Sequence, residues 1–498
     1  MAEDPTSLNP LFAYIQQQID IGQLYTETLV TLDDRNRVVP LLATEVPSRK
    51  NGGISADGRT IVYHLRRDVR FADGVALTSR DVDFTYRAIL DPHNPVSGAE
   101  PYRAIAALET PDPYTVRIRL RTRWAAAVSE LFAASDWTFG ILPSHAFNGT
   151  DLSHSDWNSR PFGSGPFRVV RWIRGEEIDL EPNAYAWRKP HLSRLVFRII
   201  NSSSTRFTFL RTHDVDVTIL SNQQVSTARA MRDVAVRSVL RNGINYLGFQ
   251  TQSRPTNDVR IRRALVEAID REALLRKYYR DLLPAAYTEI PSVSWAYDPS
   301  IRPLEYDPAR ARSELDAAGW RLHDGLRWKG GRPLSVLLVI QAGDPSRRFE
   351  SLVQQDLAIV GADVVIRAYP GTMLVAPAAA GGILPGGRFN VLFSNFYGGS
   401  DPEESEQSTC ANRAPQGANF QRWCDRAYDA AYRAQRETLS HDQRLRAFRT
   451  MQLRIRDDAV LLPITEARDY IGVNPQLRNF KPNMLYDYWN SDQWELTP

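Results

Sequence analysis

The stretch of sequence that decides the fold class is residues 334–367, LSVLLVIQAGDPSRRFESLVQQDLAIVGADVVIR. The apolar run at 334–340 predicts a buried strand, and apolar residues at helical spacing over 349–360 predict a helix that stops at Gly361. Residues 364–366 predict a second strand. A strand, a helix and a strand of these lengths form a right-handed parallel crossover. The second half of the chain is therefore predicted to be α/β.

Regular elements are expected on both sides of this crossover. Strands are expected at 61–65, 116–120, 167–172, 195–200 and 246–249, and helices from 78 or 79, from 258, and at 308–318, 425–436 and 440–457. The helix at 308–318 has the fullest signature, with Asp307 as its cap, Pro308 at its first position and Gly319 just past its end. Ser440 and Gln443 predict a capping box, and the Ala/Gly-rich residues 376–387 predict a mobile loop.

Length, composition and charge exclude several classes of protein. A chain of 498 residues predicts two to four domains, and 43% hydrophobic with 24% charged residues is typical of globular proteins. Intrinsic disorder is therefore excluded, and no apolar run is long enough for a spanning helix. The net charge of +3 comes from 61 cations and 58 anions spread along the chain, so nucleic acid is not expected as a partner.

The two cysteines of the chain, Cys410 and Cys424, allow two interpretations. A local disulfide would stabilise the fold by about 3 kcal/mol in the chain-entropy model and would place the protein in an oxidising compartment outside the cytoplasm. The alternative is a pair of unrelated buried thiols. A zinc site is not expected, because two cysteines with no histidine near them supply too few ligands.

No catalytic motif is found, and aromatic residues are abundant. The chain has no nucleophile elbow, zinc helix, phosphate loop or dinucleotide fingerprint, so neither catalysis nor a cofactor is expected. It has 11 Trp, 20 Tyr and 19 Phe, many beside small polar residues, which suits a ligand cleft. The best single candidate is residues 394–402, SNFYGGSDP, where two rings and two glycines follow a predicted strand. Glycines there let a ligand approach the backbone closely.

Several collinear motifs resemble one family. The densest group covers residues 55–92, with ADGRT at 56–60, VRFADG at 69–74 and LTSRDVDFT at 77–85. The others are Asn9-Pro10, residues 25–29, GSGPF at 163–167, residues 259–272, Ala318-Gly319-Trp320, Asp401-Pro402 and Pro463-Ile464. Together they make the chain similar to the peptide-binding family, family 5, of extracytoplasmic solute-binding proteins of ABC importers.

The resemblance implies an α/β, two-lobed periplasmic-binding-protein fold with a hinge and an extra subdomain, like that of dipeptide-binding proteins. Lobe one would be the discontinuous set 1–25, 150–252 and 466–498, with the extra subdomain at 26–149. Lobe two would be 253–465. The predicted crossover falls inside lobe two, so the two lines of reasoning agree. A ligand would be enclosed between the lobes by hinge closure.

The function implied is capture of a small solute, above all a peptide, and its delivery to the transmembrane permease of an ABC importer. Such a protein would catalyse no reaction, would hold no cofactor or metal, and would work as a monomer. The residues expected to bind the ligand are Asn395, Phe396, Tyr397, Gly398, Gly399, Asp401, Asn419, Tyr25, Tyr246 and Trp295. If oxidised, Cys410 and Cys424 would stiffen the cleft wall.

Two departures from the family pattern leave alternatives open. Peptide binders of this family commonly carry an aspartate shortly before the Asp401-Pro402 position, where this chain has Gly398-Gly399. Loss of that carboxylate removes a charge-assisted bond of about 1.5–3 kcal/mol. A longer or blocked peptide, an oligosaccharide, an opine or a metal complex therefore remains open, as does a ligand-presenting signalling module.

The second departure is at the start of the chain. Family members open with a strand before the Asn9-Pro10 element, and this chain reaches it within ten residues. A leader and part of the first strand are therefore expected to be missing from this sequence. The expected location is the periplasm or the cell surface, with a lipid anchor left open.

Overall fold

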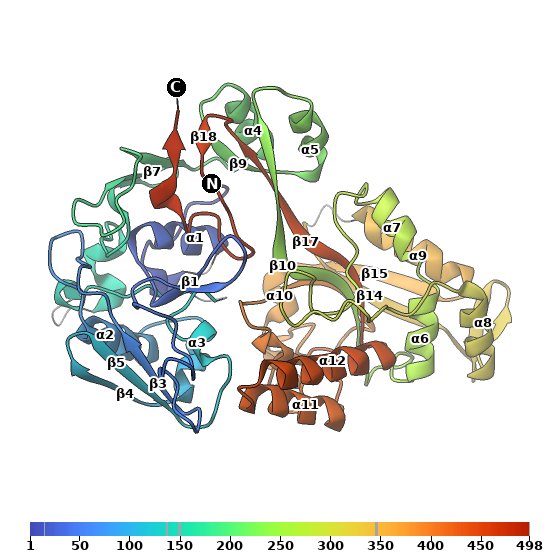
Figure 1. Cartoon of the computed structure of the whole chain (residues 1–498). Helices are drawn as coiled ribbons and strands as arrows, with labels where there is room; N and C mark the ends of the chain where they lie inside the picture. Colours follow the sequence, from blue (N-terminus) through green and yellow to red (C-terminus); the bar gives the residue numbers. More distant parts are fainter. Residues whose placement is uncertain (14, 136–137, 148–150, 344–346, 498) are drawn as a thin grey trace. The chain divides into compact units, whose positions relative to one another are not determined.

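The computed structural model describes residues 1–13, 15–135, 138–147, 151–343 and 347–497 (Figure 1). The described chain forms two compact units. Unit 1 comprises Met1–Arg241, Gly399–Asp401 and Asp469–Pro498, and unit 2 comprises Asn242–Gly398 and Pro402–Arg468. None of the helices in the described part of the chain is long and apolar enough to cross a membrane.

Unit 1 contains several small antiparallel sheets rather than one large one. Its elements are β1 (Val30–Leu32), β2 (Val38–Pro40), β3 (Thr60–His64), β4 (Ile105–Asp112), β5 (Thr115–Leu120), β6 (Phe167–Ile173), β7 (Glu177–Pro182), β8 (Leu195–Arg198), β9 (Val217–Leu220), β18 (Leu477–Arg478), β19 (Glu495–Leu496), α1 (Gln16–Tyr25), α2 (Ser79–Leu90), α3 (Ala127–Glu130), α4 (Ser203–Arg211) and α5 (Asn222–Arg229).

The sheet β3-β5-β4 confirms the strands expected at 61–65 and 116–120. In β5, buried Val116, Ile118 and Leu120 alternate with exposed arginines, because one face of the sheet meets the core and the other meets solvent. Helix α2 starts after Thr78, whose backbone N–H donates to Asp81 Oδ2 at 2.8 Å. The expected helix start is thus confirmed.

A second core of unit 1 lies between α1 and the sheet β6-β7-β8. Leu24 and Tyr25 of α1 pack there with Phe167, Ile178 and Leu180. Strand β7 is missing from the sequence-based expectations, because its acidic residues interrupt the apolar pattern. Asp179 in β7 is nevertheless buried, and it accepts hydrogen bonds from Arg194 at 2.7 Å.

Unit 2 confirms the predicted crossover. Its elements are β11 (Arg321–His323), β12 (Leu326–Lys329), β13 (Arg332–Pro333), β14 (Ser335–Gln341), β15 (Asp363–Tyr369), β16 (Val391–Tyr397), α6 (Val259–Glu267), α7 (Arg271–Lys277), α8 (Pro308–Ala317), α9 (Arg347–Ile359), α10 (Gly371–Val375), α11 (Arg426–Glu437) and α12 (His441–Asp457). Strands β14 and β15 are parallel, and α9 connects them (Figure 1).

The helices of unit 2 begin and end largely where capping chemistry predicts. Asp307 accepts from the Arg310 N–H at 2.9 Å and Pro308 opens α8, while Gly319 has a φ of +85° just past its end. The capping box predicted for Ser440 and Gln443 is wrong. Ser440 makes no side-chain cap bond at the start of α12, and the side-chain Oε1 of Gln443 accepts from the Thr438 hydroxyl instead.

Two strands belong to both units. β10 (Ala235–Phe249) passes from unit 1 to unit 2 after Arg241, and β17 (Leu461–Val473) returns to unit 1 after Arg468. The sheet that contains them has the order β15-β14-β16-β10-β17-β9. From the sequence, the lobe boundaries are expected at 252/253 and 465/466, whereas the two compact units divide at 241/242 and 468/469. A separate extra subdomain at 26–149 stays a prediction.

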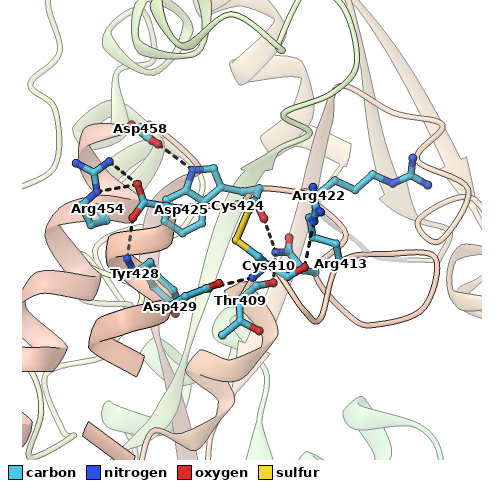
Figure 2. The surroundings of a disulfide bond; sticks show 12 residues. Thr409, Cys410, Arg413, Arg422, Cys424, Asp425, Tyr428, Asp429, Arg454 and Asp458 are labelled. Carbon is cyan, nitrogen blue, oxygen red and sulfur yellow. Dashed lines mark hydrogen bonds and ion pairs between the residues drawn. A yellow bond between two sulfur atoms is a disulfide. The ribbon is translucent and has the colours of Figure 1, made fainter. Parts of the chain in front are cut away.

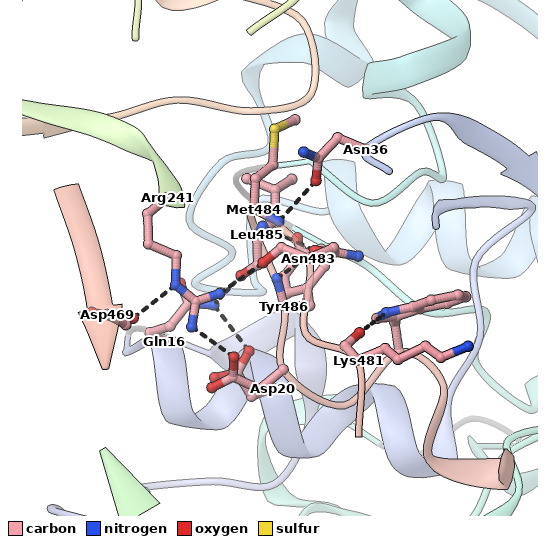
Figure 3. A network of polar contacts seen from close by, with 12 residues as sticks. Gln16, Asp20, Asn36, Arg241, Asp469, Lys481, Asn483, Met484, Leu485 and Tyr486 are labelled. Carbon is pink, nitrogen blue, oxygen red and sulfur yellow. Dashed lines mark hydrogen bonds and ion pairs between the residues drawn. The ribbon is translucent and has the colours of Figure 1, made fainter. Parts of the chain in front are cut away.

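Arg241 anchors both strands to unit 1 (Figure 3). Its guanidinium donates to Asp469 at 2.7 Å, to Asp487 at 2.6 Å and to the Asn483 carbonyl at 2.9 Å. Burial acts to lower the pKa of Arg241, but the two carboxylates together raise it above its ordinary value. Burial, followed by the charge of Asp487, raises the pKa of neighbouring Asp20. Arg241 therefore keeps its charge.

Candidate functional site

Unit 2 contains a cavity of about 200 Å³ at the paired ends of β10 and β16. The two strands are antiparallel, and Ile244 lies opposite Phe396 while Tyr246 lies opposite Ser394. Residues directly opposite each other in an antiparallel pair point to the same face. These four side chains therefore form the floor of the cavity, and all of them line it.

The remaining walls come from segments that are distant in sequence. They are the loop 289–291, Val375 and Leu384, the 3₁₀ helix Glu403–Ser408, the loop 418–421, and Tyr428 of α11. The Ala/Gly-rich segment expected to be a mobile loop folds back on α10, where the Leu384 N–H donates to the Leu374 carbonyl at 3.0 Å. Leu384 is thereby buried against the cavity.

Glu289 is the only charged side chain among the described residues that line the cavity. The residue is 9% exposed, and its Oε1 has no hydrogen-bond partner within the described part of the chain. Burial raises its pKa to about 7, against the small opposing effect of its own backbone N–H. The cavity is thus lined by a buried carboxyl group of which one oxygen, Oε1, has no hydrogen-bond partner within the described residues.

The position of Glu289 is fixed by its neighbours in sequence. The segment 284–292 runs beside β17, where the Glu466 N–H donates to the Pro284 carbonyl at 2.9 Å. Glu466 in turn accepts from both the backbone N–H and the hydroxyl of Ser292, each at 2.7 Å. The Thr288 hydroxyl donates to the Ile290 carbonyl at 2.8 Å. These bonds hold the loop on both sides of Glu289 and hold the carboxyl group at the cavity.

Two tyrosines share the cavity with Glu289. The Tyr428 hydroxyl donates to the Ser405 carbonyl at 2.7 Å. Burial, and then the charge of Glu289, raises the pKa of Tyr428 well above its ordinary value. Burial also raises the pKa of Tyr246. Both phenols therefore stay neutral, and neither supplies a positive charge to Glu289.

The disulfide expected between Cys410 and Cys424 is present, and it closes the loop that forms one cavity wall (Figure 2). Ala418, Phe420 and Gln421 of this loop line the cavity. The ends of the loop are also tied to helix α11, since Asp429 accepts from the Cys410 N–H at 3.0 Å. The cross-link therefore supports the wall that faces Glu289.

The structure brings together some of the predicted site residues. Asn395, Phe396 and Tyr246 line the cavity. Tyr397 follows them on β16 but is 55% exposed, and the Gly398 N–H donates to the Asn242 carbonyl at 2.8 Å, which continues the strand pairing.

The other predicted residues lie elsewhere. Gly399 and the buried Asp401 belong to unit 1. Tyr25 is fully buried and donates its hydroxyl to the Leu8 carbonyl, so its ring is part of the core. Asn419 is also buried, and its amide donates to the Thr409 and Trp423 carbonyls, which shapes the disulfide loop. Trp295 packs on Phe448 in another core cluster of unit 2.

Glu289 is absent from the residues that the sequence predicts to bind a ligand. It lies in the irregular segment 287–295, YTEIPSVSW, where neither periodicity nor a motif marks an acid as buried. The available signal was a single acid among apolar residues directly before Ile290-Pro291. No group of three or more His, Cys, Asp or Glu side chains that could hold a metal ion is found among the described residues.

Comparison with known proteins identifies the family. Residues 37–415 match the family described as bacterial extracellular solute-binding proteins, family 5 Middle. The oligopeptide-binding protein AppA of Bacillus subtilis is 23% identical and aligns over 99% of this chain and 90% of its own length. The nickel-binding periplasmic protein of Escherichia coli is 26% identical and aligns over 95% of this chain and 90% of its own length.

Solved structures show the same fold. NikA from Brucella suis in complex with Fe(III)-EDTA superposes with a TM-score of 0.87 over 100% of this chain and 99% of its own, at 22% identity. AppA from Bacillus subtilis in complex with a nonapeptide gives 0.80 over 100% and 98%, at 21% identity. The two-lobed α/β fold expected from the sequence is thus confirmed. The chain belongs to family 5 of the bacterial extracellular solute-binding proteins, and it is a binding protein of ABC importers rather than an enzyme.

Proposed function

We propose that the chain captures a peptide and delivers it to the permease of an ABC importer. Several of the relatives it matches are named as dipeptide-, tripeptide- or oligopeptide-binding proteins. We propose further that it works as a monomer, in the periplasm or at the cell surface. The disulfide supports this location, because such bonds persist in oxidising compartments.

The observation that carries the proposal is the size and lining of the cavity in unit 2. Pockets that enclose a whole drug-sized ligand measure about 300–1,000 Å³, whereas this cavity measures about 200 Å³. It therefore has room for one side chain of a larger solute. Its floor combines a ring and an aliphatic side chain, Phe396 and Ile244, with the hydroxyl groups of Ser394 and Tyr246. A lining with apolar and polar groups side by side suits a side chain of a peptide.

Native mass spectrometry of the protein purified from its own host tests the proposal. The bound material is released by denaturation and identified. A ladder of peptide masses is the expected result. A single non-peptide mass, such as an oligosaccharide, an opine or a metal complex, would overturn the peptide assignment and leave the family assignment unchanged.

A further inference from the structure

We propose that the cavity in unit 2 is a subsite for an alkylammonium group, with the carboxylate of Glu289 as its counter-ion. This inference rests on the proposed function, because it names the chemistry of the part of the solute that enters unit 2. The ammonium group could be a lysine-like side chain or the amino terminus of a peptide, and both sources present the same charge on a carbon chain.

The charge of the residues that line the cavity favours a cation as the occupant. Glu289 is the only charged group among the described lining residues, and no lysine, arginine or histidine is among them. A carboxylate buried without a partner is costly, and a cation that brings donors to it removes that cost. An anionic group would instead meet a like charge at short range. The cavity therefore favours a positively charged occupant.

The lining selects a carbon chain that carries this charge. Ile244, Ile290, Leu384, Leu392 and Phe396 line the same cavity as the carboxyl group and present apolar surface to it. An occupant without a carbon chain, such as a metal ion, would leave these side chains without a partner, and Glu289 alone is too few ligands to hold one. An alkylammonium group matches both the apolar surface and the carboxylate.

Apart from its own backbone N–H, Glu289 has no donor that competes for the carboxylate from the other side within the described residues. Glu289 also borders a much smaller cavity of about 10 Å³, which Tyr287 and Arg456 line as well. Arg456 donates its Nε and Nη2 to Asp457 at 2.8 and 2.6 Å, so its guanidinium already has a partner. The Tyr287 ring lies beneath the guanidinium groups of Arg271 and Arg302. Within the described residues, no cation of the protein therefore pairs with Glu289.

Two isoleucines of the lining provide the experiment. Protein labelled with ¹³C at the isoleucine δ1 methyl groups is titrated at pH 8 with n-butylamine and with n-butanol, which has the same length and no charge. The amine is expected to shift the Ile244 and Ile290 methyl signals at concentrations at least about tenfold lower than the alcohol does. Equal titration midpoints for n-butylamine and n-butanol would overturn the proposal.

Variants assign the preference to Glu289. Glu289→Gln keeps the shape of the side chain and is expected to weaken n-butylamine binding about tenfold while leaving n-butanol binding unchanged. Glu314→Gln is the matched control: this half-buried acid on α8 also has an unpartnered oxygen, and it does not line the cavity. An unchanged ratio of amine to alcohol affinity in Glu289→Gln, with the other methyl signals in place, would overturn the assignment.

The charge of Glu289 gives the binding a pH dependence. Lowering the pH from 8 to 5.5 protonates the carboxyl group, so n-butylamine binding should weaken at least about tenfold while n-butanol binding stays constant. The other ionisable groups that face Glu289 are Tyr428, Tyr246, Tyr287 and Arg456. Phenols and guanidinium groups keep their charge state over this range, so they do not produce the change. Amine binding that is independent of pH would contradict the proposal.

Peptides distinguish the two sources of the ammonium group. Trialanine is compared with its N-acetylated form, and with versions that carry lysine or norleucine at each position. A loss on acetylation that Glu289→Gln reproduces identifies the amino terminus, whereas a lysine preference that Glu289→Gln removes identifies a side chain. If peptides bind with neither preference, the subsite proposal fails and the peptide function stands. If no peptide binds, the peptide function fails, and the n-butylamine titration still decides the subsite.

Discussion

Two regions of the molecule each bury an ionisable side chain, and they differ in whether that side chain is paired. In unit 1, Arg241 is 8% exposed and donates to Asp469, Asp487 and the Asn483 carbonyl (Figure 3). In unit 2, Glu289 is 9% exposed, and its Oε1 has no partner within the described residues. The two residues are thus buried to a similar extent, but Arg241 is paired with hydrogen-bond acceptors, whereas one oxygen of Glu289 lacks a donor.

The difference separates a structural charge from a functional one. Arg241 lies where β10 and β17 leave unit 1, and its bonds hold both strands to the segment 483–487. Removing either partner would leave a buried charge. Glu289 ties no elements together through its carboxyl group, so the protein gains nothing in stability from its charge. A buried carboxylate that costs stability and lines a cavity indicates a binding role.

The largest effect on stability is expected from a substitution of Arg241. Arg241→Met leaves Asp469 and Asp487 without their cation, and it should lower the free energy of unfolding by about 3–5 kcal/mol. Urea unfolding measures the loss. Arg37→Met is the control, because the Arg37 side chain is 65% exposed in its ion pair with Asp33 and should cost less than about 1 kcal/mol. Equal losses of unfolding free energy in the two variants would contradict the structural role of Arg241.

A substitution at Glu289 is expected to change the free energy of unfolding in the opposite direction. The pKa of its carboxyl group is about 7 in the folded protein, against an ordinary value of 4.5 in an unfolded chain. The folded protein thus binds this proton more tightly than the unfolded chain, and the wild type loses stability as the pH rises from 4.5 to 7. Glu289→Gln should therefore raise the free energy of unfolding by about 3 kcal/mol at pH 8 and leave it unchanged near pH 4.

Urea unfolding at these two pH values measures the gain. Glu289→Gln should be more stable than the wild type and yet bind n-butylamine more weakly. A loss of stability at pH 8 would mean that the protein already satisfies the carboxylate, and the contrast with Arg241 would disappear.

A smaller effect is expected from the disulfide, which supports the cavity wall. Cys410→Ser with Cys424→Ser should lower the free energy of unfolding by at most about 3 kcal/mol, the value for a loop of this length. Reduction of the wild-type protein should do the same, as a lower melting temperature. It should also alter the Ile290 methyl signal, because the loop and Ile290 line the same cavity. A melting temperature that is unchanged by reductant would contradict this.

The smallest effects on stability are expected from neighbouring rings of β16. Phe396 lines the cavity, whereas Tyr397 is 55% exposed and points to the opposite face. Phe396→Ala should weaken n-butylamine binding several-fold, by loss of apolar contact, and lower stability by no more than about 1–2 kcal/mol. Tyr397→Ala should leave n-butylamine binding unchanged. Equal weakening by both variants would mean that the cavity floor is misassigned.

Much of the fold follows from local chemistry in the sequence. The β14-α9-β15 crossover, the start of α2 at Thr78 and the caps of α8 were all predicted, because each depends on residues close together in the chain. The exceptions have physical reasons. In β7, buried Asp179 obtains its partners from Arg171 and Arg194, and such distant pairing is invisible in a local pattern.

The site was predicted less completely than the fold. Phe396, Asn395 and Tyr246, which the sequence predicts to bind a ligand, line the cavity, and their binding role stays a prediction. Tyr25 and Trp295 have the same residue type but lie in core clusters, and composition does not separate these two environments. Glu289 was missed because its importance comes from burial without a partner, which only the folded arrangement of distant segments creates.

The titration of the Glu289 carboxyl group itself decides whether this buried acid serves binding. Its ¹³C signal, assigned by comparison with Glu289→Gln, is followed against pH without and with saturating n-butylamine. We expect a pKa of about 7 without the amine and a value lower by about 1–3 units with the amine bound, because an adjacent cation favours the ionised form. A pKa near 4.5 without the amine, or one that n-butylamine does not change, would contradict the assignment of Glu289 as a counter-ion.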